Sequence, residues 1–255
     1  MSGDAVPTTS ERMAVVMARH LADGEVVIMG AVSALPQAAC QLAQSTHAPH
    51  LSYIAGGSGA VNPRTVTVSS CDERLLDAPS VLPLPEVILL EGRGDVIDVF
   101  FAGGLQIDRY GNTNLVAVGD WHHPRLRGPG TVGLPFLPRA GRVVIYTMAH
   151  SPRTFVPRVD FVGGPGFLSG PAQWRAAGVP GGGPALVVTD LAVLDFDPGS
   201  LAMRLASVHP GVSVDQVTGA TGFELVIPAT VPVTPPPTAT ELAALRRVDP
   251  LGLLR

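Results

Sequence analysis

Several neutral polar side chains follow an apolar run near the middle of the chain, within residues 103–114, which read Gly-Gly-Leu-Gln-Ile-Asp-Arg-Tyr-Gly-Asn-Thr-Asn. The preceding residues 96–102 are mostly apolar and predict a buried strand. Glycines at the end of a strand allow a ligand to approach the backbone closely. Ligands of open α/β sheets bind outside the carboxyl ends of the strands. The segment therefore predicts a binding edge; an ordinary polar β-turn, typical of Arg-Tyr-Gly-Asn, is the alternative.

The overall composition excludes several classes of chemistry. The 17 basic residues are all arginine, so Schiff-base or pyridoxal-phosphate chemistry through a lysine of this chain is excluded. The net charge of −4, without a basic run, argues against a nucleic-acid partner. The hydrophobic fraction of 46% against 15% charged residues suggests that extra surface is buried against a partner.

The two cysteines predict neither a disulfide framework nor a metal site. Cys40 and Cys71 are too few for either, and we expect Cys71 to be a small buried apolar residue. The adjacent His122 and His123 lack nearby ligands for a metal. Since the N-terminus does not resemble a signal peptide and no apolar run approaches the roughly 20 residues of a membrane span, we expect a cytoplasmic protein without membrane contact.

The order of the expected elements is typical of an α/β fold. A helix over 9–22 with Thr9 or Ser10 as its cap, a strand over 26–29, a helix over 36–45 and a strand over 51–55 are joined by short links. Such βαβ connections predict an open, mostly parallel sheet flanked by helices.

The remaining elements complete this α/β domain. We expect strands over 142–148 and 203–207, an edge strand over 155–161, a hairpin of 185–188 with 192–196 and a last strand over 223–227. We also expect helices over 84–92 and 213–221, the second with a capping box of Ser213 and Gln216. Residues 61–85 and 163–183 predict irregular loops. We therefore divide the chain into a flexible N-terminus (1–10), one domain (11–228), and a Pro-rich arm with a terminal helix (229–255) that docks on a partner.

Four motifs in the same order resemble the β-type subunit of class I coenzyme A transferases. Residues 103–114 resemble the family signature GGxQVDxxGNxN, and residues 30–36 resemble its first-strand turn G-x-x-S-x-x-P. Residues 187–196 resemble the strand pair I-T-D-L-x-V-F-D-F, and residues 209–223 the ending H-P-G-V…A-T-x-F. The family's G-G-A-x-D loop has its counterpart at 128–136, where the acidic residue is missing. The resemblance covers roughly residues 10–250 and implies a CoA-transferase-like fold.

One departure concerns the turn after the second strand. Transferases of this family carry a glutamate there, which attacks the acyl-CoA thioester and forms an acyl-glutamyl anhydride. Here residues 55–59 read Ala-Gly-Gly-Ser-Gly, without a carboxylate. The turn resembles two glutamate-lacking branches, the small subunit of 3-methylglutaconyl-CoA decarboxylases and the β subunit of steroid ring-opening hydrolases. The decarboxylases have a cysteine near this turn, whereas position 56 is glycine, although Cys71 could approach from the irregular segment.

The resemblance implies an enzyme that acts on an acyl-CoA, and it leaves three alternatives open. The first is decarboxylation or hydrolytic C–C cleavage with an α-type partner in a heterodimer or heterotetramer; the second is CoA transfer with a glutamate on the partner; the third is a non-catalytic scaffold subunit. Coenzyme A would enter as part of the substrate, without a covalently bound cofactor. The implied substrate-binding or oxyanion-binding residues are Gly56, Gly57, Ser58, Gly103, Gly104 and Gln106. The residues implied to brace the turn are Asp108, Asn112 and Asn114, and no residue of this chain is assigned as acid or base.

Overall fold

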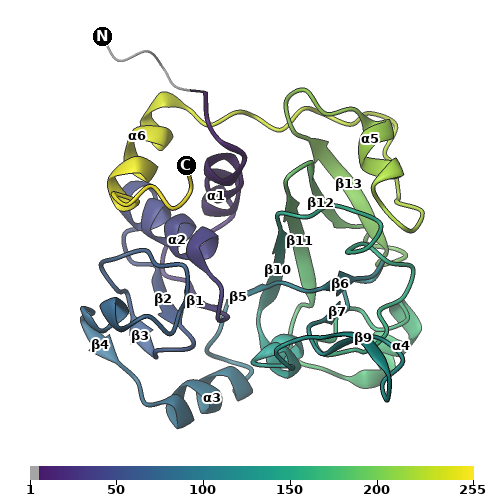
Figure 1. The fold of residues 1–255 in the computed structure, drawn as a ribbon, viewed down its shortest axis with the longest axis horizontal. Coiled ribbons are helices and arrows are strands. Elements are labelled where there is room, and N and C mark those ends of the chain that lie inside the picture. The colour runs from purple at the N-terminus through teal and green to yellow at the C-terminus, as the bar shows by residue number, and fades with distance from the viewer. Residues whose placement is uncertain (1–5) are drawn as a thin grey trace. The chain divides into compact units, whose positions relative to one another are not determined.

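The structure, a computed structural model shown as a ribbon in Figure 1, describes residues 6–255. The chain folds into two compact units. The first comprises the residues up to Leu90, Val96–Phe101 and Pro236–Arg255; the second comprises Glu91–Asp95 and Ala102–Pro235. Helices and strands are interspersed along the chain, so the predicted α/β class is confirmed.

Parallel strands form the centre of the sheet in the first unit. Strand β1 (Val26–Met29) pairs in parallel with β2 (Ser52–Ala55) and with β5 (Val99–Ala102). The short strands β3 (Ala60–Val61) and β4 (Ser80–Val81) extend the sheet antiparallel beyond β2. The residues of β1, β2 and β5 are almost all buried, as expected for parallel strands covered on both faces. The predicted β–α–β order of this region is confirmed.

Three helices of the first unit pack on one another: α1 (Thr9–Arg19), α2 (Ala34–Thr46) and α6 (Ala239–Val248). Helix α2 also packs on β1 and β2. Arg246 binds Glu11 (Nε to Oε1 2.7 Å), and Arg19 binds Glu241 (Nη2 to Oε2 2.7 Å), so two ion pairs join α6 to α1. Helix α6 therefore belongs to the first unit and covers helices of its own chain; its expected docking on a partner stays a prediction.

The N-terminal helix begins at Thr9, two residues before the predicted domain. Thr8 caps α1 in a capping box with Glu11, since each side chain binds the other's backbone N–H. Thr8 also donates its hydroxyl to the carbonyl oxygen of Leu254 (2.6 Å). The part of the predicted flexible N-terminus at residues 1–5 lies outside the described residues.

The second unit contains a four-stranded sheet. Strand β10 (Arg142–Thr147) pairs in parallel with β11 (Pro184–Thr189), and β12 (Ala192–Phe196) and β13 (Met203–Val208) continue the sheet antiparallel. The predicted hairpin is confirmed as β11–β12. Two small hairpins precede this sheet in the chain: β6 (Gln106–Ile107) with β7 (Thr113–Asn114), and β8 (Ala117–Gly119) with β9 (Pro124–Arg127).

The shorter helical segments complete the set of elements. Helix α3 (Leu84–Gly92) has the predicted bounds, and α5 (Val214–Gly219) has the predicted capping box of Ser213 with Gln216. Helix α4 (Pro171–Ala177) lies within the stretch predicted to be a loop. The two 3-10 helices are η1 (Glu73–Leu76) and η2 (Leu134–Arg139).

Two predicted strands are absent from residues 6–255. In 155–161 only Phe155 forms a single bridge, to Ile107, and Pro157 follows it; proline cannot donate a ladder hydrogen bond. In 223–227 only Val226 forms a bridge, to Arg204, and Pro228 ends the contact. Within the described residues, no helix is long and apolar enough to cross a bilayer, and no group of three His, Cys, Asp or Glu side chains could hold a metal ion.

His150 is a buried structural histidine beside β11. Its ring nitrogens lie 2.9 Å from the hydroxyls of Thr189 and Thr221, and its ring stacks on Phe155 with 4.1 Å between centroids. Both nitrogens are thus used within the fold, so His150 does not act as a base for the neighbouring Ser151. Burial lowers the pKa of His150 to about 4.

This lowered pKa predicts a loss of stability in acid. Between pH 6.5 and 4 the unfolded chain binds a proton at His150 that the folded chain does not, so the free energy of unfolding falls as the pH drops through this window. We expect a loss of about 2–3 kcal/mol between pH 7 and pH 4.5, measured by urea denaturation. His150→Gln should show a shallower pH dependence; a slope equal to that of the wild type would contradict the prediction.

Candidate functional site

Three segments of the first unit meet at the carboxyl ends of β1 and β2. Met29 and Ala55 are neighbours in the parallel ladder, so the turns that follow them, 30–33 and 56–59, start side by side. Residues 68–71 lie across both turns: Ser70 N donates to Ala31 O (2.7 Å), and Ser33 N donates to Val68 O (3.2 Å). Gly57 N donates to Ser70 Oγ (3.1 Å). This edge is where ligands of α/β sheets bind.

The backbone N–H groups of the glycine turn are used inside the fold. Gly56 N donates to Met29 O (3.1 Å), and the N–H groups of Ser58 and Gly59 both donate to Ala55 O (3.2 and 2.9 Å). The Ser58 hydroxyl also donates to Ala55 O (3.3 Å). A substrate oxygen that accepts a bond from Gly56 or Gly57 would have to replace one of these bonds. The implied oxyanion role of Gly56, Gly57 and Ser58 stays a prediction.

The Cys71 thiol lies against this turn. A methyl group added at Gly57 would lie 2.5 Å from Cys71 Sγ and 2.6 Å from Ser70 Oγ. Cys71 is exposed, so its expected burial is wrong. The reason is local: the bonds from residues 68–71 to the two turns place this segment over the sheet edge, where the solvent reaches it. The structure therefore brings a thiol to the turn that lacks the family glutamate.

The remaining predicted site residues form one hairpin in the second unit. Strands β6 and β7 pair Gln106 with Asn114, and Gly111, with a φ of +71°, closes the turn between them. Asp108 is buried and accepts hydrogen bonds from Tyr110 N (3.0 Å) and from the N and Nδ2 of Asn112 (3.1 and 3.0 Å to Oδ1). Burial raises the pKa of this carboxyl despite these bonds.

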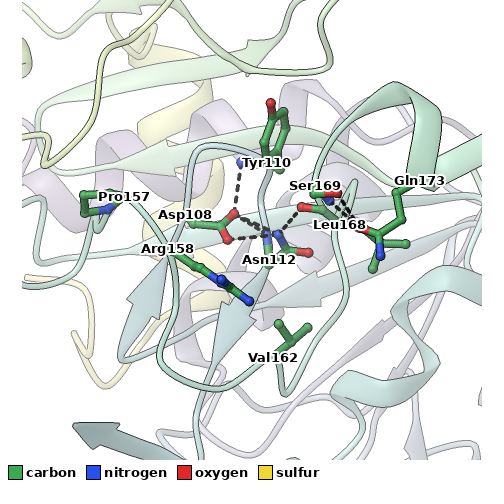
Figure 2. A pocket seen from close by; sticks show the side chains of 9 residues that line it. All are labelled: Asp108, Tyr110, Asn112, Pro157, Arg158, Val162, Leu168, Ser169 and Gln173. Atoms are coloured by element: carbon green, nitrogen blue, oxygen red, sulfur yellow. Dashed lines mark hydrogen bonds between the residues drawn. The ribbon is translucent and has the colours of Figure 1, made fainter.

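Asn112 joins this turn to a second loop. Its Nδ2 donates to Asp108 Oδ2 (2.9 Å) and to Leu168 O (2.7 Å), and its Oδ1 accepts from Gly166 N (2.9 Å). Figure 2 shows the dashed bonds from Asn112 to Asp108 and Leu168. Asn114 acts similarly within its hairpin, with bonds to Ala117 O (2.6 Å) and Gln106 Oε1 (2.7 Å). Buried amides can thus hold two loops that are distant in sequence.

Gln106 is also committed to the fold. It is buried, its Nε2 donates to Asp160 Oδ2 (2.9 Å), and its Oε1 accepts from Asp160 N (3.0 Å) and Asn114 Nδ2 (2.7 Å). Its proposed role in orienting substrate stays a prediction. The glycines before it are partly exposed; a methyl group at Gly104 would lie 2.7 Å from Gln106 O, so this position requires glycine.

A pocket of about 540 Å³ opens beside the buried carboxylate of Asp108. Its lining comes from the signature turn and from two later segments (Figure 2): Asp108, Tyr110, Asn112, Pro157, Arg158, Val162, Leu168, Ser169 and Gln173. Ser169 and Gln173 were not predicted from the sequence as residues of a pocket. The available signal was Gly170-Pro171, because proline at the first helical position predicts the helix start that α4 confirms.

A buried carboxyl group at the end of α3 also went unnoticed. Glu91 is 6% exposed, and one of its carboxylate oxygens has no hydrogen-bond partner. Burial raises the pKa of Glu91 to about 7. The apolar run directly before it gave no signal for this burial, because Ile88 and Leu89 are themselves exposed.

Three other histidines of the second unit are part of the folded core or of the surface. His209 is fully buried, and its Nε2 lies 2.8 Å from Thr189 O, as a structural histidine does. His122 and His123 are exposed, and their N–H groups both donate to Asp120 Oδ1. The site residues predicted from the sequence thus fall into two groups, the glycine turn in the first unit and the signature hairpin in the second.

Comparisons with known proteins identify the relatives of this chain. Residues 10–220 match the family model for coenzyme A transferase. The chain is 36% identical to the B subunit of 3-oxoadipate CoA-transferase from Pseudomonas knackmussii, over 95% of this chain and 93% of the relative. It is 30% identical to the cholesterol ring-cleaving hydrolase IpdB subunit of Rhodococcus jostii, over 96% and 94%.

Solved structures agree with the sequence matches. The crystal structure of glutaconate coenzyme A-transferase from Acidaminococcus fermentans superposes with a TM-score of 0.86 at 31% identity, covering 97% of this chain and 96% of that one. The decarboxylase AibA/AibB superposes with a TM-score of 0.82 at 29% identity, covering 97% of each chain. Since the family model and relatives above 30% identity both cover most of the chain, the protein belongs to the coenzyme A transferase family of enzymes.

Proposed function

We propose that this chain is the β-type subunit of a heteromeric enzyme that cleaves a C–C bond of an acyl-CoA, by decarboxylation or by hydrolysis. An α-type subunit of the same family would be its partner, because relatives of both reaction types are named as subunits of two-component enzymes. Coenzyme A would enter with the substrate, and no covalently bound cofactor is required.

The absence of a carboxylate at the glycine turn carries this proposal. The segments 30–33, 56–59 and 68–71, which meet at the sheet edge, contain no charged residue. The next acid along the chain, Asp72, accepts two bonds from Arg74 (Nε to Oδ1 3.0 Å and Nη2 to Oδ2 2.7 Å). The bidentate bonds from Arg74 lower the pKa of Asp72 to about 2. Because its carboxylate is held by Arg74, Asp72 is not a free nucleophile. This chain therefore offers no group at the turn for an acyl anhydride.

Both forms of C–C cleavage need a proton at the same place. When carbon dioxide leaves, or when a hydrated ketone breaks its C–C bond, the electron pair stays on the carbon that is conjugated with the thioester. That carbon then takes up a proton. The Cys71 thiol beside Gly57 can donate its S–H proton there and recover it from water, so we propose Cys71 as the proton donor of this chain.

Mass spectrometry of the products tests the reaction type. The chain, co-expressed with its α-type partner, is incubated with acyl-CoAs that carry a second carboxylate or a ring ketone, with and without an acceptor acid. Loss of carbon dioxide or gain of water without acceptor is the expected result. Acceptor-dependent exchange of CoA would instead show a transferase, and full activity of the partner alone would show a scaffold subunit.

Cys71→Ala should lower kcat of the same complex by at least about 100-fold, as expected for loss of a general acid. Cys40→Ala is the matched control, because Cys40 is a buried thiol of α2 away from the turn, and it should keep kcat within a few-fold. Wild-type kcat in Cys71→Ala would place the proton donor on the partner.

A further inference from the structure

We infer that the non-reacting part of the acyl group is hydrocarbon and that it rests on an uncharged face around Val32 and Val68. This inference rests on the proposed function, because it takes the sheet edge at β1 and β2 as the acyl site. It adds the chemical class of the substrate, which neither the family nor the missing glutamate specifies.

The two valines are unusually exposed. Val32 is 72% and Val68 is 55% exposed, although valine is among the residues most often buried. Val32 lies in the turn after β1, and Val68 lies in the segment that crosses both turns. Val32 forms a bridge with Ser69, and the carbonyl of Val68 accepts from Ser33 N. The exposed residues of these segments, together with the turn, are Ala31, Val32, Gly57, Val68 and Cys71.

The face offers no counter-ion to a charged acyl group. Its three segments carry no Arg, Asp, Glu or His. The arginines that flank residues 68–71 in the chain are already paired, Arg64 with Asp77 (2.8 Å) and Arg74 with Asp72 (2.7 Å). A remote carboxylate placed here would lose its water without gaining a cation, which is costly. A hydrocarbon group would gain by covering the valines and the Gly57 backbone.

The position of the face indicates that the substrate is the molecule that covers it. It adjoins the turn at which the thiol of Cys71 lies, and its backbone is fixed by hydrogen bonds to both sheet-edge turns. An apolar surface at the carboxyl ends of parallel strands is a ligand surface in open α/β folds.

Calorimetric binding to the α/β complex tests the inference without relying on turnover. Two acyl-CoAs that share the same reacting group are compared, one whose remote, non-reacting end is a methyl-branched hydrocarbon and one whose remote end is a carboxylate. We expect tighter binding of the hydrocarbon form, and we expect Val68→Thr and Val32→Thr each to weaken it about fourfold or more while leaving the carboxylate form unchanged. Threonine keeps the shape of valine and replaces one methyl group by a hydroxyl.

Val233→Thr is the control, since Val233 is 58% exposed but lies in the Pro-rich segment after β13. Equal affinity for the two acyl-CoAs, or no change on either substitution, would overturn the inference. So would weakened association of the subunits with unchanged acyl-CoA affinity, because the face would then be a subunit contact. Failure of the proposed function would look different: the binding preference would persist, while the complex transferred CoA or left the C–C bond intact.

Discussion

Replacing Asn112 with alanine is expected to lower the free energy of unfolding by about 3–4 kcal/mol. The substitution removes the amide that joins Asp108 to the loop of Gly166 and Leu168. The buried carboxylate of Asp108 would lose the two hydrogen bonds that it accepts from Asn112 Nδ2, and the backbone groups of Gly166 and Leu168 would lose their partner. Unsatisfied buried groups cost their full desolvation energy, which explains the size of the effect.

Urea denaturation of the α/β complex and of the isolated chain measures this loss. Gln173→Ala is a suitable control, since Gln173 lines the same pocket but is exposed, and its side chain accepts bonds from the neighbouring Ser169. It should cost less than about 1 kcal/mol. If the two variants lose the same stability, the Asn112 bonds do not hold the loops together.

Gly59→Ala should destabilise the first unit by about 3 kcal/mol or more, whereas Gly24→Ala should cost about 1 kcal/mol. Both glycines have positive φ angles, +72° and +82°, so the backbone strain of alanine is similar at the two positions. The two positions differ in the space available for a methyl group. A methyl group at Gly24 meets nothing within 4 Å, but one at Gly59 would overlap the carbonyl oxygen of Leu82.

This overlap cannot be relieved by a side-chain rotation, because Leu82 N donates to Gly59 O (2.9 Å) and fixes the two backbones together. The β2–β3–β4 connection would have to open, and with it the turn that holds Gly57. We therefore expect Gly59→Ala to lower both the melting temperature and kcat. Equal melting temperatures for the Gly59 and Gly24 variants would show that the backbone there is free to move.

Local patterns in the sequence predicted the elements whose signal is contained in a few neighbouring residues. The helix of Leu84–Gly92 and the capping box of Ser213 with Gln216 both appear as predicted. The cap of the first helix was misplaced at Thr9 or Ser10; the box requires an acid three residues later, which only Thr8 with Glu11 provides. The predictions of strands at 155–161 and 223–227 were wrong, because an alternating apolar pattern does not show whether a neighbouring strand is available for pairing.

The sequence by itself determined the family and the loss of the glutamate, because both are properties of residue identity and order along the chain. Only the tertiary structure decided that Cys71 is exposed beside Gly57, that Asn112 reaches Gly166 and Leu168, and that α6 packs on α1 and α2. The physical reason is the same in each case. These contacts join residues more than ten positions apart, and their energies depend on which backbone groups folding brings within bonding distance.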